Sequence, residues 1–233
     1  YLAMIKKVLS DKKITTKWFY NYADTEEFIN KFSITIKALI ALKKMKHAKI
    51  GFIGGISPGF DNMEVDQSII KKNIGTTIEE STIKDLIQIA KGFDQKTIDS
   101  EILKIKSVAS SISVSNEDSF NKVTRVYFAL KKIKKDNNWD SLAVQCWSQF
   151  QDLYGIAPCM AYSWMGSEDG VAVACEGDVQ GSMSMLLLNY ISNAEKSSTL
   201  LDLATFDKKA DALQMWHCGV SPRHFANEDG IKW

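Results

Sequence analysis

The sequence predicts an α/β fold in which helices cover both faces of a parallel sheet, followed by the start of a second, β-rich domain. Apolar runs with β-branched residues alternate with amphipathic helical patterns along most of the chain, which is typical of parallel strands joined by helices. The pattern changes near residues 177–195, after which two strand-like runs flank a polar turn. We therefore expect one domain over residues 1–176 and the beginning of another over residues 177–233.

Four helices are predicted in the first part of the chain from the helical spacing of apolar residues. The first follows a capping box at residues 24–27, in which side chains satisfy free amides of the first turn. Ser81 is expected to cap the second helix and Gly92 to close it. The predicted helices cover residues 25–46, 81–92, 97–110 and 117–135.

Three apolar runs supply the predicted strands, at residues 49–53, 142–147 and 171–176. The first ends at Gly54-Gly55, as a buried parallel strand does where it gives way to a loop at its carboxyl end. A helical stretch near residues 151–165 separates the other two strands. A helix rich in Met and Leu follows at residues 181–191, and we interpret its methionines as packing residues.

Composition and charge exclude several classes of function. With 29 Lys+Arg against 28 Asp+Glu, the net charge of +1 gives no basic field to attract nucleic acid. The apolar runs fall far short of the roughly 20 residues of a membrane-spanning helix, and the start of the chain has no signal-peptide pattern. We expect a cytoplasmic protein, and the abrupt ends of the sequence predict an internal portion of a longer subunit.

The four cysteines show neither CxxC pairing nor regular spacing; they are Cys146, Cys159, Cys175 and Cys218. A disulfide framework or a zinc ribbon is therefore not expected. Free cysteine behaves as a small hydrophobe, so we predict ordinary buried thiols.

Chemically useful side chains follow the predicted strands at their carboxyl ends, where ligands bind in open parallel sheets. Glu176 ends the third strand, and Trp147 and Gln149 follow the second. The loop at residues 54–61 follows the first strand, and its glycines allow close approach of a ligand. A tight structural turn accounts for this loop equally well, since it matches neither GxGxxG nor a P-loop.

A β-hairpin is predicted where residues 199–206 and 212–217 flank the polar turn at 207–211. In this pairing Asp202 lies almost opposite His217, so a carboxylate and an imidazole approach across adjacent strands. Asp202 interrupts an apolar strand, where an unpaired carboxylate is costly. Two interpretations stay open: Asp202 makes a structural hydrogen bond and His217 is a core histidine, or both bind a cation.

Together, Glu176, Asp202 and His217 suit a divalent cation such as Mn²⁺ or Mg²⁺, whereas thiolates would have suited zinc. A cation held in this way can chelate two neighbouring sugar oxygens while a carboxylate transfers a proton.

Three segments, taken in order, resemble the metal-site segments of the L-fucose isomerase and L-arabinose isomerase superfamily. They are residues 175–185 (CEGDVQGSMSM), 201–204 (LDLA) and 216–219 (WHCG). The similarity covers about residues 140–225 well and residues 54–61 more loosely. The ordered set is fairly specific, and no segment alone would be.

The resemblance implies a Mn²⁺-dependent aldose–ketose isomerase that acts through an ene-diol on a fucose-like or arabinose-like sugar. It also implies that Glu176 and Asp202 bind the metal and act as the base and acid pair. The histidine matching His217 resembles a ligand of the arabinose enzymes. The Trp147–Gln149 loop is similar to one that touches the substrate.

The same resemblance implies a homo-oligomer, a trimer or hexamer of three-domain subunits. Residues 1–176 would form the Rossmann-like middle domain, and residues 177–233 the opening of the metal-site domain. A further histidine that the family brings from downstream has no counterpart in this sequence.

Two other classes of protein remain open. The missing ligand favours a non-catalytic sugar-binding or regulatory module that keeps the isomerase fold. A flavodoxin-like or dinucleotide-binding domain is supported only by the alternating strands and helices and by the Gly54-Gly55 loop. The identity of the sugar does not follow from the sequence, because a few hydrogen bonds select it.

Overall fold

The computed structural model describes residues 1–113, 116–192 and 197–233. The chain forms two compact units, Tyr1–Ile40 and Ala41–Trp233. The first unit contains α1 (Leu2–Asp11) and the beginning of α2 (Glu26–Met45). In it, the rings of Phe19, Phe28 and Phe32 pack together with centroids 5.3–5.7 Å apart. The second unit holds the sheet and the candidate site, and the remaining description concerns that unit.

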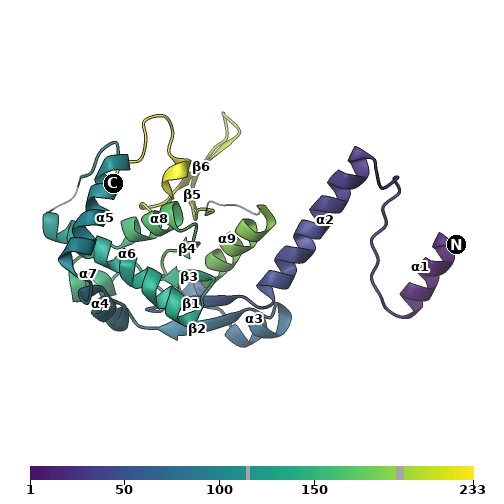
Figure 1. Ribbon diagram of the computed structural model, residues 1–233, viewed down its shortest axis with the longest axis horizontal. Helices are drawn as coiled ribbons and strands as arrows, with labels where there is room; N and C mark the ends of the chain where they lie inside the picture. Colours follow the sequence, from purple (N-terminus) through teal and green to yellow (C-terminus); the bar gives the residue numbers. More distant parts are fainter. Residues whose placement is uncertain (114–115, 193–196) are drawn as a thin grey trace. The chain divides into compact units, whose positions relative to one another are not determined.

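A four-stranded parallel sheet forms the centre of the second unit, which confirms the predicted α/β class (Figure 1). Its strands run in the order β2 (Thr77–Ser81), β1 (Lys49–Ile53), β3 (Ser141–Val144) and β4 (Val173–Ala174). The pairing places Ile50 beside Ile78 on one side and Ser141 on the other, while Leu142 pairs with Val173. The carboxyl ends of all four strands therefore meet at one edge of the sheet.

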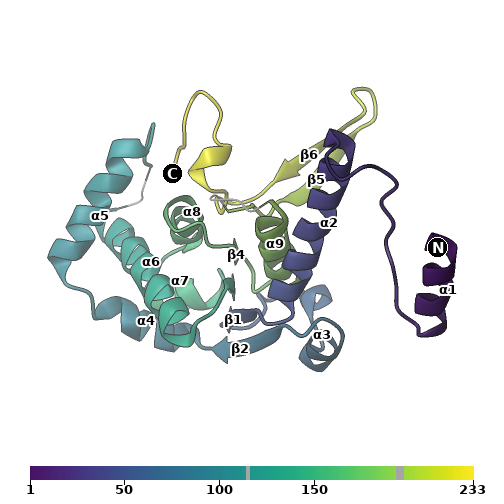
Figure 2. The same cartoon turned by 45° about the vertical axis from the view of Figure 1, so that its right-hand side comes forward.

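Helices cover both faces of this sheet (Figure 2). Leu142 and Val144 point into the larger core, whereas Ala143 between them points into the smaller one, as the two-residue period of a strand requires. The larger core is covered by α4 (Ile83–Lys91), α5 (Gln95–Val108), α6 (Glu117–Asn137), α7 (Gln149–Tyr154) and α8 (Cys159–Glu168). The smaller core is covered by the end of α2, by α3 (Gln67–Asn73) and by α9 (Val179–Ser192).

Several boundaries differ from the predicted ones. Strand β2 was not predicted, because its sequence TIEES carries two glutamates at a half-buried edge and gives no apolar run. The cap of α4 is Thr82 and not Ser81, since the Thr82 hydroxyl accepts a hydrogen bond from the Asp85 amide at 3.1 Å. The predicted strands at 142–147 and 171–176 are shorter in the structure, because their last residues turn into the loops that carry the candidate site.

The predicted helix at 151–165 is two helices, α7 and α8. Gly155 ends α7 in a left-handed conformation with φ 71°, which glycine adopts without steric cost. Pro158 then precedes α8 and cannot donate a backbone hydrogen bond to continue a helix. Two short 3₁₀ turns, η1 (Asp61–Met63) and η2 (Arg223–Phe225), complete the helical elements of the described residues.

The predicted hairpin is confirmed as β5 (Asp202–Asp207) paired antiparallel with β6 (Ala212–Trp216). Every residue of both strands is exposed, so the hairpin has no core of its own within the described chain. The predicted domain boundary after residue 176 remains a prediction about the whole subunit.

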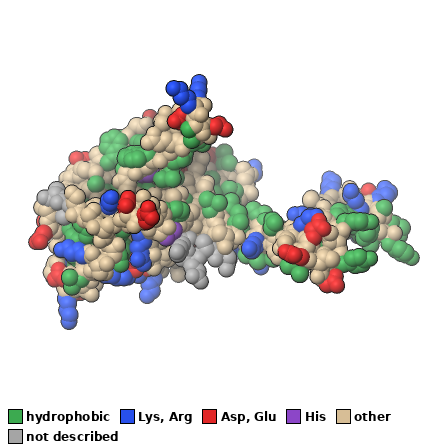
Figure 3. Space-filling view, turned by 90° about the horizontal axis from the view of Figure 1, so that it is seen from above, with side chains coloured by type: hydrophobic (Ala, Val, Ile, Leu, Met, Phe, Trp, Pro, Cys, Tyr) green, Lys and Arg blue, Asp and Glu red, His purple; other side chains and the backbone are tan. Residues whose placement is uncertain are grey.

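The distribution of surface charge and the length of the helices indicate which kinds of partner the chain can have. On the face shown in Figure 3, acidic and basic side chains are interspersed, in line with the net charge of +1. Among the described residues, each helix is too short or too polar to cross a lipid bilayer.

Gly51, in the middle of β1, packs directly against the Trp139 indole. A Cβ at this position would lie 2.1 Å from Trp139 Cε3, whereas the indole Nε1 is held by a hydrogen bond to Glu79 at 2.7 Å. We expect Gly51→Ala to destabilise the fold by about 1–3 kcal/mol, because the buried ring has little room to move. Urea unfolding of the chain checks this.

Gly92→Ala is the matched control, because a Cβ there meets its nearest atom at 3.3 Å and the backbone φ is −79°. Equal unfolding midpoints for both variants would contradict the packing argument.

Candidate functional site

The loops at the carboxyl edge of the sheet bring together the predicted site segments. Residues 54–57 follow β1, residues 145–149 follow β3, and residues 175–178 follow β4. Two hydrogen bonds join these loops: the Ser57 amide donates to the Glu176 carbonyl at 2.9 Å, and the Gly177 amide donates to the Val144 carbonyl at 3.2 Å. The edge is therefore a hydrogen-bonded frame and not a set of independent loops.

The turn after β4 holds Glu176 in an unusual backbone conformation. Glu176 has φ 62° and Gly177 has φ 77°, so two successive residues occupy the left-handed region. A glutamate there costs on the order of 1–2 kcal/mol, and such outliers gather at functional sites. Gly177 has to be glycine, because a Cβ would lie 2.1 Å from the Gly55 carbonyl oxygen. The neighbouring loop thus fixes the direction of the Glu176 side chain.

The hairpin brings the other two predicted ligands to this turn. Asp202 pairs with Trp216, so His217 is the next residue along the opposite strand. Ligand atoms of Glu176, Asp202 and His217 all lie within 4.8 Å of one another. Asp202 is exposed, so its carboxylate does not carry the cost of burial that its apolar neighbours suggested, because the hairpin has no apolar layer over it. Glu176 is buried and His217 half-buried.

Two buried atoms of this trio lack hydrogen-bond partners among the described residues, Glu176 Oε2 and His217 Nε2. An unpaired buried polar atom costs about 1–3 kcal/mol, so such atoms indicate a missing ligand. Carboxylate and imidazole are ligands of Mn²⁺ and Mg²⁺ sites or of Zn²⁺, and a cation at this point would satisfy the Glu176 oxygen directly. The donor set of the site therefore fits a divalent cation.

The electrostatics of the site concern Glu176 and His217. Burial raises the pKa of Glu176 to about 7, with the His217 ring opposing the shift and the Asp202 carboxylate adding to it. Burial lowers the pKa of His217, whereas the hydrogen bond to Cys218 and the nearby carboxylates raise it. The second group of effects is larger, so the pKa of His217 lies above its usual value. A carboxyl group that titrates near neutral pH can both accept and return a proton.

The Nδ1 atom of His217 accepts a hydrogen bond from the Cys218 amide at 2.8 Å. In the neutral ring the hydrogen consequently sits on Nε2, which makes Nε2 a donor. Coordination of a cation through Nε2 would move that hydrogen to Nδ1 and break the bond to Cys218. Of the three residues, the two carboxylates can bind a cation without any such change.

Two further residues of this edge are Ser57, which belongs to the predicted loop at residues 54–61, and Gln145, which the sequence analysis missed. Their Oγ and Oε1 atoms are also buried without a hydrogen-bond partner in the described chain, while the Gln145 amide nitrogen donates to the Ile56 carbonyl at 2.9 Å. Among the described residues, the other such atoms are Glu176 Oε2, His217 Nε2 and Glu168 Oε1, and the last has Arg223 at 3.2 Å. Neither Ser57 nor Gln145 stands in a recognisable motif, so only their positions in the fold single them out.

The predicted sugar-contacting residues lie on the loop between β3 and α7. Trp147 is exposed and lines a cavity of about 880 Å³. Gln149 instead donates its side-chain amide to the Gly54 carbonyl at 2.9 Å and so supports the loop after β1. Contact of either residue with a sugar remains a prediction.

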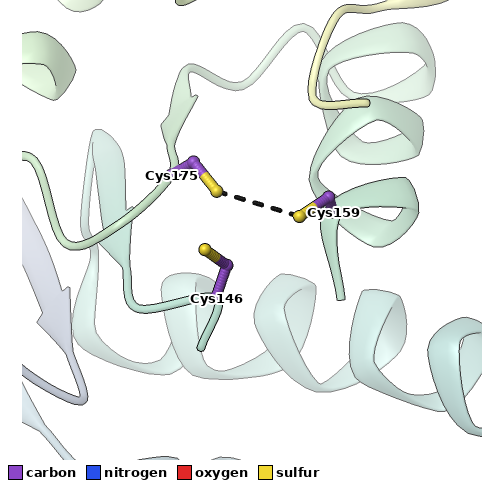
Figure 4. A group of neighbouring side chains, drawn as sticks. All are labelled: Cys146, Cys159 and Cys175. Atoms are coloured by element: carbon purple, nitrogen blue, oxygen red, sulfur yellow. Dashed lines mark hydrogen bonds between the residues drawn. The ribbon is translucent and has the colours of Figure 1, made fainter. Parts of the chain in front are cut away.

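The four cysteines converge beside this site. Cys159 Sγ lies 3.8 Å from Cys175 Sγ and 3.7 Å from Cys218 Sγ, and the ligand atoms of Cys146, Cys159 and Cys175 lie within 4.8 Å of one another (Figure 4). All four are free thiols, and Cys218 is exposed, so the expectation of four ordinary buried thiols is wrong for Cys218. Hydrogen bonds from Cys159 and Cys175 lower the pKa of Cys146.

Three proteins called sulfoquinovose isomerase are similar to this chain. The one from Priestia aryabhattai is 26% identical over 192 residues, that from Alkalicoccus urumqiensis 25% over 194 residues, and that from Clostridium sp. (strain MSTE9) 23% over 216 residues. These matches cover 82–91% of this chain and 42–47% of the relatives, so the chain spans less than half the length of the curated relatives it matches. No family model matches the sequence.

The relatives bear on the family expected from the sequence. Their name supports a relationship to sugar isomerases in general, and it does not single out the fucose or arabinose enzymes. All of the site segments described above lie within the second compact unit, residues 41–233.

The raised pKa of Glu176 predicts a pH-dependent effect of Glu176→Gln on the metal-free chain. The folded-state pKa, about 7, lies above the ordinary 4.5, so the folded state holds this proton more tightly than the unfolded state. The stabilisation is complete below about pH 4.5 and is lost as pH rises through about 7. Glutamine does not ionise, so relative to wild type the variant should gain about 2 kcal/mol between about pH 4.5 and pH 8.

Urea unfolding in the presence of a chelator at the two pH values measures this gain. Glu228→Gln, a change at an exposed glutamate, should show no such dependence. A constant difference between Glu176→Gln and wild type at both pH values would refute the assignment.

Proposed function

We propose that this chain carries part of the active site of a metal-dependent sugar isomerase that interconverts an aldose and a ketose. The observation that carries the proposal is the convergence of Glu176, Asp202 and His217 within 4.8 Å, with two of their buried atoms unpaired. The similarity to sulfoquinovose isomerases gives independent support. Because the chain spans under half of those relatives, the activity belongs to the protein that the source gene encodes in full.

In the proposed site Glu176 and Asp202 hold Mn²⁺ or Mg²⁺, and His217 is the third ligand or a hydrogen-bond donor to the sugar. Bound there, the cation would polarise two neighbouring oxygens of the open-chain sugar. The carboxylates are hard ligands of the kind these ions select. Gln145 Oε1 offers a further hydrogen bond to a hydroxyl group of the sugar, because this buried atom has no partner among the described residues.

The isomerisation needs one group that takes a proton from C2 of the aldose and returns it to C1. We assign this role to Glu176, whose carboxylate lies with Asp202 and His217 at the proposed site. As the C2 proton leaves, its electron pair forms the C1–C2 double bond and the aldehyde oxygen takes a proton, giving the ene-diol. The O2 hydroxyl then loses a proton as C1 gains one, so the reaction has no net proton change. Asp202 is placed to exchange protons with these oxygens.

The substrate has three candidates. The resemblance of the site segments favours a fucose-like or arabinose-like sugar, whereas the named relatives favour sulfoquinovose. We propose sulfoquinovose first, because the similarity to those relatives extends over at least 82% of the chain and not over the site segments alone.

The substrate proposal predicts which aldose is converted. The full gene product, supplied with Mn²⁺, should form ketose from sulfoquinovose, and L-fucose and L-arabinose are assayed in parallel. Ketose formation from one of the other two sugars would change the substrate and keep the reaction. Sugar binding without ketose formation from any of the three would favour the non-catalytic sugar-binding module.

The metal proposal predicts that Glu176→Gln and Asp202→Asn each weaken Mn²⁺ binding by more than about tenfold, because each removes a charged ligand. Asp202 is exposed, so Asp202→Asn should shift the free energy of unfolding by no more than about 0.5 kcal/mol. The electron paramagnetic resonance signal of free Mn²⁺ and thermal unfolding measure the two effects.

Asp211→Asn is the matched control: it makes the same change at the turn of the same hairpin, where asparagine suits the local φ of 49°. It should leave Mn²⁺ affinity unchanged. If Asp202→Asn lowered Tm and left Mn²⁺ affinity alone, Asp202 would be a structural anchor of the hairpin and the proposed site would be wrong.

A further inference from the structure

Each of the four cysteines of the 233-residue chain has its sulfur close to that of another. The ligand atoms of Cys146, Cys159 and Cys175 lie within 4.8 Å of one another, and Cys218 Sγ lies 3.7 Å from Cys159 Sγ. Cys146 follows β3, Cys159 begins α8, Cys175 follows β4 and Cys218 follows β6. Their sulfurs meet although the four residues come from four different segments.

We propose that Cys146, Cys159, Cys175 and Cys218 form a second metal site, which takes a thiophilic cation such as Zn²⁺. A tetrahedral site with Zn–S bonds of about 2.3 Å holds its sulfurs about 3.8 Å apart. The Cys159–Cys175 and Cys159–Cys218 distances of 3.8 and 3.7 Å match that spacing. Figure 4 shows the sulfurs of Cys146, Cys159 and Cys175 directed toward one another.

The two metal sites differ in the chemistry of their donors. Glu176 and Asp202 offer oxygen, which suits Mn²⁺ or Mg²⁺, whereas four thiolates select Zn²⁺ or another soft ion. Cys175 and Glu176 are consecutive, as are His217 and Cys218, so the same two backbone segments serve both sites. The inference does not depend on the isomerase activity, because it follows from the sulfur geometry alone.

A cation at the thiolate site would help to hold Glu176, Asp202 and His217 in place. Three of its ligands belong to the α/β layers, and Cys218 belongs to the segment that leaves the hairpin. Since no residue of β5 or β6 is buried, the hairpin gains little support from packing within the described chain. A cation bound by Cys218 and the other three thiols would hold His217 and Asp202 beside Glu176.

An ion can reach the cluster from solvent. Cys146, Cys159 and Cys218 line the cavity of about 880 Å³ that Trp147 also lines. A closed structural site needs such an entry path when metal binds after folding.

Titration of the reduced chain with Co²⁺, a spectroscopic substitute for Zn²⁺, tests the proposal. One equivalent should produce a thiolate-to-cobalt charge-transfer band in the near ultraviolet together with strong tetrahedral d–d bands, and Zn²⁺ should abolish both. Cys159→Ser should weaken Zn²⁺ binding by more than about tenfold, because it removes the central thiolate. Cys218→Ser should weaken Zn²⁺ binding in the same way. Because Cys218 is exposed, this variant tests the site even if the buried Cys159→Ser change prevents folding.

Glu176→Gln is the matched control, since it changes the oxygen site and leaves all four thiols. It should keep the charge-transfer band while weakening Mn²⁺ binding, so the two proposals fail independently. Absence of the band in reduced wild-type protein would overturn the thiolate site. Loss of the band in Glu176→Gln, or its persistence in both cysteine variants, would overturn it as well.

Discussion

The contact between the Glu176–Gly177 turn and the Gly55–Ser57 loop is the constraint on which the rest of the site depends. Two successive left-handed residues end β4, and the turn is locked because the Ser57 amide bonds the Glu176 carbonyl and Gly177 lies against the Gly55 carbonyl. An unconstrained glutamate would leave this conformation, which costs on the order of 1–2 kcal/mol. The register of the parallel sheet therefore decides where the Glu176 carboxylate points, since it sets the neighbouring loop at the same edge.

The same turn sets the positions of two kinds of donor. Cys175 is fully buried at the end of β4, and Glu176 follows it with a carboxylate that has an unpaired oxygen. Successive residues at a strand end point to different sides of the chain, so one short segment can present a sulfur to one group and an oxygen to another. On the hairpin side His217 and Cys218 lie together instead, since their ligand atoms and that of Cys175 are all within 4.8 Å of one another.

The hairpin supplies ligands but little stability. Its residues are exposed on both strands, so their placement follows from the Asp202–Trp216 register and from the segment after it. There, Val220 enters the larger core and Ser163 donates a hydrogen bond to the Ser221 carbonyl at 2.7 Å. Glu176 comes from the stable α/β layers, whereas Asp202 and His217 come from the weakly supported hairpin. A cation that binds donors from both parts would therefore fix the hairpin against the layers.

The sequence by itself determined the α/β class, most of the helices, the hairpin and the identity of the trio Glu176, Asp202 and His217. Those features depend on local periodicity, caps and short ordered segments, which are properties of neighbouring residues. Strand β2 escaped because its two consecutive glutamates break the apolar run, and Asp202 is exposed in spite of its apolar neighbours because burial depends on what covers a strand. Only the tertiary structure decided that the sulfurs of irregularly spaced cysteines come close together and that Ser57 and Gln145 are buried in loops at the carboxyl edge of the sheet. Such contacts join residues far apart along the chain, and the packing of the sheet, not the spacing of the sequence, sets the distances between them.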